Sequence, residues 1–253
     1  MQNVLDHSPA RAVEQVVVGI PGIVDYEQQG LQQAPNLPAH WEPMLTADWL
    51  QNQLGIPVCL ANDADLAAVG EAWFGAARNY QDMIYVTVST GVGGGAVLGG
   101  RLVKGRYSAG EIGHTLISRP FLGEDKPVTV ESAGSGSAIT QSAQRAGLVE
   151  RDSALADMVR QGHSVATKIW DDAVDAISVG IVNMAWMLSP QIVVIGGGVG
   201  VNADLIIGRV HQALDRFGPT HKQPIKVVGA SLGDDAALVG AARWGEATGG
   251  THE

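Results

Sequence analysis

A glycine-rich segment that ends in an acid and a histidine is the first candidate for chemistry in this sequence. Residues 86–114, "VTVSTGVGGGAVLGGRLVKGRYSAGEIGH", contain nine glycines and close on Glu111 and His114. Glycine permits positive φ and a close approach of the backbone, so consecutive N–H groups of "STGVGGGA" can converge on a phosphate, with the Thr90 hydroxyl as a further donor. A tight hairpin that holds no ligand has the same composition, so both interpretations stay open at this point.

The same segment contains the pattern of a dinucleotide-binding turn in the wrong context. Gly91, Gly93 and Ala96 satisfy G-x-G-x-x-A. Glu111 lies 20 residues beyond the first of these glycines, as the pattern requires. That fingerprint needs a helix directly after the glycines, whereas "AVLGGRLV" alternates like a hairpin with Gly-Gly at its turn. We therefore predict consecutive antiparallel strands here and no dinucleotide site.

A second glycine loop, "IGGGVG" at residues 195–200, lies between an apolar run and a helical pattern. Alone it is weak evidence, since such turns also allow plain close packing of a helix on a strand. Two glycine loops, one between strands and one between a strand and a helix, suggest a nucleotide held between two edges of a cleft. Actin-like sugar kinases have this arrangement, whereas dehydrogenases do not.

The elements that must position these residues alternate between strand and helix, which predicts an α/β fold. Residues 15–25, "QVVVGIPGIVD", indicate a buried strand with a Pro-Gly turn, and residues 56–75 indicate a strand that continues into a helix. Asn62 and Asp63 then lie at the carboxyl end of a strand, where ligands bind in open α/β sheets. Asp63 could equally be the helix N-cap, a position that Asp favours. The apolar face of the helix is predicted to be Leu66, Val69, Trp73 and Phe74.

The second half of the chain predicts helices around two further strands. Residues 141–189 have a helical pattern that is interrupted near "RQGHS" and ends at Pro190. The strand "QIVVIGGGVG" follows, and a last strand, "PIKVVGA", precedes a helix in "GDDAALVGAARWG". Between these strands we expect a helix capped by Asn202 and ended by Gly-Pro, with an apolar face of Ile206, Val210, Leu214 and Phe217.

Composition argues against several classes of function. With 26 acidic and 16 basic side chains the 253-residue chain carries a net charge of −10, and its basic residues are scattered. Such a surface repels nucleic-acid phosphates and anionic lipid, so we expect neither as a partner. The lone Cys59 allows no intramolecular disulfide and is expected to be a buried thiol. We find no signal-peptide pattern and no run of 18 apolar residues, and therefore expect a cytoplasmic protein without a membrane span.

Seven segments, taken in order and spacing, carry a family resemblance. They are "GIPGIVD", "APNLPAHW", "NDADLAAVGEAWFGAA", "VTVSTGVGGGAV", "GEIGH", "SPQIVVIGGGV" and "GDDAALVGAARWG". Together they resemble the ROK family of bacterial sugar kinases and sugar-responsive repressors, from about residue 15 to 245. The resemblance implies an actin-like, ribonuclease-H-like α/β fold of two lobes that close over ATP and a hexose, here with a shortened first lobe.

The resemblance also implies how the chain is divided. The boundary between the lobes is expected at the polar stretch of residues 78–82. Residues 1–80 would form a partial N-terminal lobe with the sugar and the catalytic base, and residues 81–232 a C-terminal lobe that binds sugar and nucleotide. Residues 233–253 would form a C-terminal helix and tail.

Roles for the candidate residues on the sugar side follow from the resemblance. Asp63 is similar to the general base that takes the proton from the attacking sugar hydroxyl, a role worth about 10² to 10⁴ in rate. Asn62 resembles a hydrogen-bond partner of a sugar hydroxyl. Glu111 and His114 resemble the sugar-binding acid and histidine, and Glu131 in "VESAGSGSAI" matches a second sugar-binding acid. Without the resemblance, a histidine after Ile-Gly is more often a structural residue.

On the nucleotide side, the resemblance implies ATP with Mg²⁺. It places Thr90 and Gly91 near the phosphates and Gly196, Gly197 and Gly198 near the adenosine. Kinases of this family begin with an Asp-x-Gly-x-Thr turn that binds Mg²⁺ and the phosphates, but no such turn precedes "VVVGIPG". The first 14 residues are instead predicted to be a fragment of a connecting helix. Phosphoryl transfer depends on positioning and charge neutralisation, so this departure should cost activity.

A second departure concerns zinc. Most ROK kinases carry a cysteine-rich zinc loop between the Gly-His pair and the downstream acid, and the single cysteine of this chain cannot supply it. We therefore expect no zinc. Packing alone would then have to position Glu131.

Three functions remain after these considerations. The first is an ATP-dependent, glucokinase-like kinase of a hexose or N-acetylhexosamine, with activity that the missing turn could impair. The second is a non-catalytic sugar-binding sensor or a fragment of a ROK transcriptional regulator. The third is a remnant that binds neither ligand. A homodimer is expected from the family, while the choice among glucose, N-acetylglucosamine and N-acetylmannosamine is left open.

Overall fold

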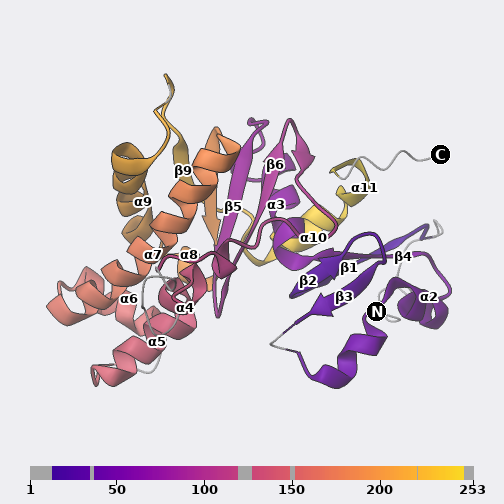
Figure 1. The fold of residues 1–253 in the computed structure, drawn as a ribbon, viewed down its shortest axis with the longest axis horizontal. Helices are drawn as coiled ribbons and strands as arrows, with labels where there is room; N and C mark the ends of the chain where they lie inside the picture. The colour runs from indigo at the N-terminus through magenta and orange to yellow at the C-terminus, as the bar shows by residue number, and fades with distance from the viewer. Residues whose placement is uncertain (1–12, 35–36, 119–126, 149–151, 221, 248–253) are drawn as a thin grey trace.

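The computed structural model describes residues 13–34, 37–118, 127–148, 152–220 and 222–247 (Figure 1). The helix fragment predicted at the start of the chain lies almost wholly outside these residues. The strands are β1 (Val16–Ile20), β2 (Ile23–Asp25), β3 (Gly30–Gln33), β4 (Val58–Asn62), β5 (Met83–Val88), β6 (Val92–Leu98), β7 (Arg101–Leu102), β8 (Ile192–Gly196) and β9 (Lys226–Gly229). The helices are η1 (Ala39–Met44), α2 (Ala47–Leu54), α3 (Asp63–Trp73), η2 (Ile112–His114), α4 (Val130–Gly134), α5 (Gly136–Arg145), α6 (Asp152–Arg160), α7 (Ser164–Leu188), α8 (Gly197–Gly200), α9 (Ala203–Phe217), η4 (Gly233–Asp235), α10 (Ala236–Ala241) and α11 (Trp244–Ala247).

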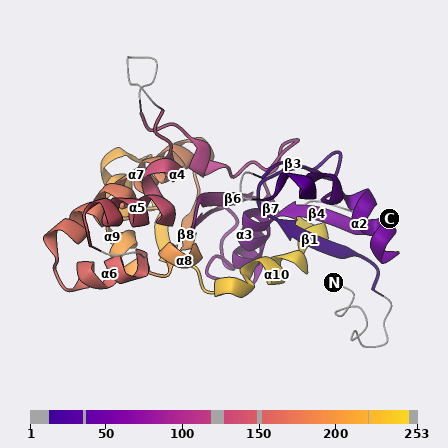
Figure 2. The same ribbon diagram turned by 90° about the horizontal axis from the view of Figure 1, so that it is seen from below.

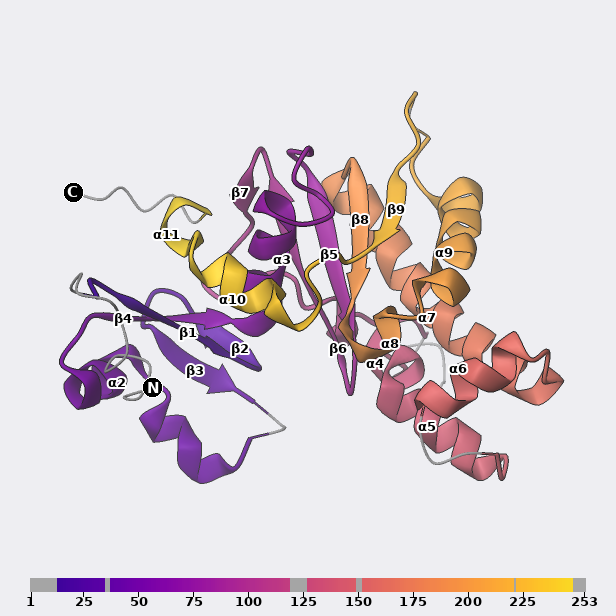
Figure 3. The ribbon, with the colours of Figure 1, turned by 180° about the vertical axis from the view of Figure 1, so that it is seen from behind.

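The centre of the molecule is a mixed sheet of five strands in the order β7-β6-β5-β8-β9. β5 is antiparallel to β6 and parallel to β8, which is in turn parallel to β9. Alternate residues of β5 enter two different cores: Ile84 and Val86 pack with α7 and α9, whereas Met83 and Tyr85 pack with α3 and α10. Because helices cover both faces, the central strands are apolar nearly throughout, as the sequence predicted (Figure 3).

The N-terminal part of the chain forms two smaller sheets. β1 pairs with β4 in parallel, from Val16 opposite Val58 to Ile20 opposite Asn62, and β2 pairs with β3 in antiparallel fashion. Both strands of the first pair were predicted, although β1 is half-buried and not fully buried. Figure 2 shows α3 and α10 between these small sheets and the five-stranded sheet. α3 precedes the predicted boundary at residues 78–82 but packs against the central sheet, which follows it. The boundary therefore stays a prediction.

α3 and α10 meet with their backbones in contact. A side chain at Gly70 would overlap the carbonyl oxygen of Ala236, and one at Gly240 would overlap the carbonyl oxygen of Leu66. Only residues without a Cβ allow helices to approach this closely. The crossing therefore fixes α10 against α3 with little freedom (Figure 3).

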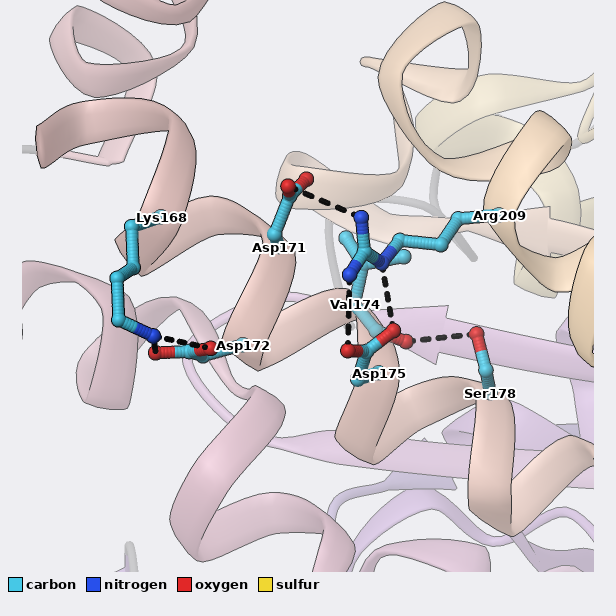
Figure 4. A network of polar contacts seen from close by, with 7 residues as sticks. All are labelled: Lys168, Asp171, Asp172, Val174, Asp175, Ser178 and Arg209. Carbon is cyan, nitrogen blue, oxygen red and sulfur yellow. Dashed lines mark hydrogen bonds and ion pairs between the residues drawn. The ribbon is translucent and has the colours of Figure 1, made fainter. Parts of the chain in front are cut away.

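On the other face of the central sheet, ion pairs join two long helices. The guanidinium of Arg209 on α9 contacts both carboxylate oxygens of Asp175, at 2.5 and 2.9 Å, and lies 2.9 Å from Asp171 (Figure 4). Both aspartates belong to α7, so the arginine fork spans one helical turn. Lys168 pairs with Asp172 within α7 at 2.9 Å and adds no contact between helices. Some of the charged residues that are scattered along the sequence therefore serve to hold α7 and α9 together.

Most predicted elements are confirmed, and the differences have local causes. Phe74 and Phe217 were assigned to apolar faces, but both are exposed because each lies at the end of its helix, beyond the core. Asn202 is the N-cap of α9 by position, yet its side chain donates to the Val199 carbonyl and does not accept a helix N–H. α4 was not predicted, because five residues are too few to show a helical period.

Cys59 is half-buried, and burial raises the pKa of its thiol above the ordinary value. In the parts of the chain that the structure describes, no helix combines the length and the hydropathy needed to cross a membrane.

We predict that the replacement Gly240→Ala destabilises the protein by about 3 kcal/mol, because its methyl group would enter the space of a carbonyl oxygen that cannot move away. Gly208→Ala is the matched control: this glycine is also helical, in α9, and open space surrounds it. The control should gain up to about 1 kcal/mol from helix propensity. Urea unfolding of both variants tests this, and equal stabilities would show that the close crossing is not needed.

Candidate active site

A cavity of about 520 Å³ lies between the β4–α3 turn and the edge of the central sheet at which β5 ends. The structure brings nine of the ten predicted site residues to its lining. They are Asn62, Asp63, Thr90, Gly91, Glu111, His114, Glu131, Gly197 and Gly198. Gly196 is the exception: a Cβ there would lie 2.6 Å from the Tyr85 hydroxyl, so packing requires this glycine.

The β4–α3 turn separates the roles of its two polar residues. Asn62 is the N-cap of α3, since its side-chain oxygen accepts hydrogen bonds from the backbone N–H groups of Ala64 and Asp65 at 2.9 and 3.0 Å. Its amide nitrogen donates to the Gly22 carbonyl at 2.9 Å, which leaves one N–H for a ligand. Asp63 is therefore the first helical residue and lines the cavity. The alternative that Asp63 serves as the N-cap is not what the structure shows.

Glu131 is held by hydrogen bonds and not by packing alone, contrary to the expectation from the loop without cysteines. Its Oε2 accepts the backbone N–H of Val92 at 2.9 Å. It lies in the first turn of α4, where Thr129 and Ser132 form a reciprocal capping box. A side chain at Gly91 would overlap the Glu131 carboxylate, so this glycine makes room for the acid.

The segment with Glu111 and His114 is seated on β6 through glycines. A side chain at Gly110 would overlap the Gly94 carbonyl, and one at Gly113 would overlap the Val92 carbonyl. Gly95 faces the other way, where a Cβ would lie 2.7 Å from the Ala68 methyl group of α3. Much of the glycine content therefore serves backbone packing around the site. The hairpin interpretation of "AVLGGRLV" is confirmed by β6 and β7, and positive φ occurs at both turn glycines.

Glu111 precedes η2 and His114 is its last residue, and polar atoms of the two side chains lie near each other. The Nε2 of His114 lies 3.8 Å from the Oε2 of Glu111, and more than half of the histidine side chain is exposed. This places an acceptor and a donor side by side at the cavity wall.

A second cavity, of about 540 Å³, adjoins the first on the side of α5 and α8. Gly136 at the start of α5 donates its N–H to the Ser89 carbonyl at 2.8 Å, and the Ser137 hydroxyl donates to the Thr90 carbonyl at 2.8 Å. Sequence reasoning missed this wall, although "SGS" ahead of a helical pattern was an available signal. Its lining contains no charged residue among the described ones and is mostly polar: Ser89, Thr90, Gly136, Ser137, Thr140, Gln141, Gln144, Gly198 and Val199.

The electrostatics of the main cavity are dominated by acids. Among the described residues, Asp63, Glu111, Glu131 and Asp234 line it, and no lysine or arginine does. Desolvation by the surrounding protein raises the pKa of Asp63, although its side chain is exposed to the cavity. Burial also raises the pKa of Glu111, with His114 opposing the shift and the Asp63 and Glu131 charges adding to it. These carboxylates thus disfavour an anionic group in direct contact with them, and a carboxylate here can accept a proton.

Comparison with known proteins places the chain in a family. The model of the ROK family matches residues 2–247. The glucokinase of Thermotoga maritima is 31% identical over 260 aligned positions, which cover 95% of this chain and 82% of that protein. The bifunctional enzyme NanE/NanK of Brucella melitensis is 37% identical over 190 positions, 75% of this chain and 35% of that longer protein.

A solved structure supports the same assignment. A ROK family glucokinase from Streptomyces griseus, in complex with glucose and AMPPNP, superposes with a TM-score of 0.78 at 29% identity, over 93% of this chain and 82% of that one. The fold is thus the actin-like fold of ROK glucokinases. The chain belongs to the ROK family.

The buried carboxyl of Asp65, in the first turn of α3, leads to a prediction of how the stability of the fold depends on pH. Burial is the main cause that raises the pKa of its carboxyl to about 7. A raised folded-state pKa stabilises the fold at low pH, and this contribution is lost as pH rises through the folded value. The free energy of unfolding of wild type should therefore fall as the pH rises from 5 to 8, whereas Asp65→Asn has no carboxyl to ionise. The free energy of unfolding of Asp65→Asn, taken relative to wild type, should thus be about 3 kcal/mol higher at pH 8 than at pH 5.

Urea unfolding at the two pH values measures this difference. The exposed Asp48→Asn on α2 is the control and should show no such change. A gain that is the same at both pH values would contradict a neutral Asp65 in the folded protein at pH 5.

Proposed function

We propose that this chain is an ATP-dependent kinase of a neutral hexose or N-acetylhexosamine. The observation that carries the proposal is the position of Asp63: it follows the N-cap Asn62, its Oδ1 accepts, among the described residues, only the neighbouring Ala64 N–H, and it lines a cavity together with Glu111, His114 and Glu131. The relationship to proteins named glucokinase supports the reaction class. The cytoplasmic location expected from the sequence fits the use of ATP.

The chemistry of the cavity supports a neutral sugar as the acceptor. Three carboxylates accept hydrogen bonds from hydroxyl groups, and charged acceptors make such bonds stronger than neutral ones. The same carboxylates repel a sugar acid, and no lysine or arginine of the described lining compensates for that repulsion. Glu111 and Glu131 would accept from sugar hydroxyls, while His114 and the free N–H of Asn62 would donate to them.

Asp63 would act as the general base. The sugar hydroxyl loses its proton to the Asp63 carboxylate, its oxygen forms a bond to the γ-phosphorus of ATP, and the bond from that phosphorus to the bridging oxygen of ADP breaks. A raised pKa suits the role, because a carboxylate with a higher pKa takes the hydroxyl proton more readily. Asn62, Glu111 and His114 would orient the hydroxyl for this step.

The nucleotide would lie along the two glycine turns. Thr90, Gly91 and the start of α8 offer N–H and hydroxyl donors between the two adjoining cavities. The uncharged second cavity would take the nucleoside, with Gly197 and Gly198 at its edge and Gly196 packed behind them. Gly197 has a φ of 86°, so it turns the chain where a residue with a side chain would be strained.

The described residues include no group of three acidic, histidine or cysteine side chains able to hold a metal by themselves. This fits a Mg²⁺ ion that enters on the phosphates of ATP and keeps several water ligands, as Mg²⁺ commonly does. When bound, the ion supplies charge neutralisation that the cavity lining lacks. Zinc plays no part in the proposal.

The alternative from the family is a sugar sensor that binds without catalysis. It predicts the same sugar pocket but gives Asp63 no role in turnover. A homodimer, which the family resemblance suggests, is compatible with either function.

We predict that Asp63→Asn abolishes sugar-dependent ADP formation, with a loss of at least about 100-fold, because the amide cannot accept the hydroxyl proton. Sugar-induced stabilisation should persist, since the variant keeps the size of the side chain. The measurement is ADP release with Mg-ATP across a panel of hexoses and N-acetylhexosamines, in parallel with thermal shifts.

The control is Asp172→Asn, which removes an exposed carboxylate on α7 that lies in the lining of neither cavity. It should keep full turnover. Turnover that survives in Asp63→Asn would remove Asp63 as the base, and sugar-stabilised wild-type protein without turnover would favour the sensor.

The raised pKa of Asp63 predicts the acid side of the pH profile. The base works only when ionised, so kcat/KM should fall as pH decreases through a value above the ordinary 3.8 of an aspartate. Initial rates between pH 4 and 8, with circular dichroism to confirm folding at each pH, measure this. A profile that stays flat down to about pH 4 would contradict a desolvated base.

A further inference from the structure

A tyrosine from another part of the chain completes the cap of α3 behind the cavity. The Tyr26 hydroxyl donates to the Oδ2 of Asp65 at 2.5 Å. The backbone N–H of Asn62 donates to the same hydroxyl at 3.2 Å. Tyr26 follows β2 and lies 39 residues before Asp65 in the sequence. The contact therefore joins a distant segment to the turn that carries Asp63.

Helix-capping geometry explains why a bridge is needed. In a capping box, a glutamate or glutamine at the third helical position reaches back to the N–H of the N-cap residue. Here Asn62 is the N-cap and Asp65 holds that third position, with a side chain one methylene shorter than glutamate. The Tyr26 hydroxyl fills the gap, because it accepts from Asn62 and donates to Asp65. We call this chain of two hydrogen bonds the Tyr26 bridge.

The bridge is built at some cost to stability. Asp65 is fully buried, and its Oδ1 has no hydrogen-bond partner among the described residues. A buried carboxyl oxygen without a partner is unfavourable, so capping strength alone does not account for an acid here. The tyrosine ring is fixed independently, with its centroid 5.8 Å from the Trp244 ring and 5.6 Å from the Lys104 ammonium group.

We propose that Tyr26 and Asp65 are positioning residues that lock the Asn62–Asp63 turn and so keep the Asp63 carboxylate aimed into the cavity. The inference rests on the proposed function for its catalytic consequence. The bridge itself is independent of that function and has its own readout. Loss of the bridge should loosen the turn without removing any group that contacts sugar or ATP.

The charges that face Asp65 agree with this role. Glu111 and Asp63 raise its pKa, whereas Tyr26 and Lys104 lower it, and burial outweighs all of them. The carboxyl is therefore at least partly neutral near pH 7, and an asparagine can replace it as an acceptor for the Tyr26 hydroxyl. Alanine cannot, which provides a rescue test.

Amide hydrogen exchange tests the bridge directly. The variants are Tyr26→Phe, Asp65→Ala, Asp65→Asn and the pair Tyr26→Phe with Asp65→Ala, with Tyr80→Phe as a control whose hydroxyl lies 3.4 Å from Lys226, away from the cavity. We expect the Asn62 amide to exchange about tenfold faster in Tyr26→Phe, the loss of one hydrogen bond. Asp65→Asn and Tyr80→Phe should exchange as wild type does. Unchanged exchange in Tyr26→Phe would overturn the bridge.

Kinetics of the same variants test the consequence. We expect kcat to fall about tenfold in Tyr26→Phe and Asp65→Ala, with the KM for ATP within twofold of wild type. Asp65→Asn should retain most of kcat, and the double variant should lose no more than the single ones. Where Asp65→Ala fails to fold, Tyr26→Phe, whose ring still packs on Trp244, decides the matter.

The outcomes separate this inference from the proposed function. In one outcome, wild type turns over and Tyr26→Phe has the same kcat although its Asn62 amide has lost protection from exchange. That outcome would overturn the positioning role and leave the proposed kinase function intact. Additive losses in the double variant would overturn the shared bridge. Absent wild-type turnover would overturn the proposed function and the catalytic consequence together, while amide exchange still decides the bridge.

Discussion

The site depends on close contact between backbones at glycine. Gly110 and Gly113 lie against carbonyl groups of β6, and Gly70 and Gly240 let α3 and α10 cross without intervening side chains. Each contact removes a layer of side chains that would otherwise separate the elements by several ångströms. The cavity therefore has walls set by rigid backbone. Side chains such as Glu111 and Glu131 project from positions that have almost no room to shift.

Sequence patterns predicted the elements well and the tertiary contacts hardly at all. Apolar periodicity and turn residues identified β4, α3, β8 and α9, because burial on one face or both leaves its mark on nearby residues. The glycines of residues 91–96 were identified as important, but composition could not tell a phosphate turn from a seat for other backbone. Gly95 faces α3 and Gly94 faces the Gly110 carbonyl, and those partners are known only from the folded chain.

The same limit applies to the candidate site. Asn62 and Asp63 were found through their place after a strand, yet which of them caps the helix depends on where Gly22 lies. Tyr26 carried no signal, since its partner is distant in sequence and its neighbours form an ordinary turn. The hydrogen bond from the Val92 N–H to Glu131 was also not predicted, because nearly every residue has a backbone N–H and the sequence does not show which one a side chain will contact.

α3 links the two walls of the cavity through its two ends. Its first turn holds Asp63 in the cavity lining. Near its last turn the buried Glu71 accepts hydrogen bonds from the backbone N–H groups of Ser231 and Leu232, both at 2.8 Å, directly before Gly233 and Asp234 of the cavity lining. The Glu71 carboxylate also accepts the Ala76 N–H at 2.7 Å, so this one buried side chain joins the end of α3 to the segment after β9. The segment after β9 and the turn that carries the proposed base are therefore attached to the two ends of one short helix.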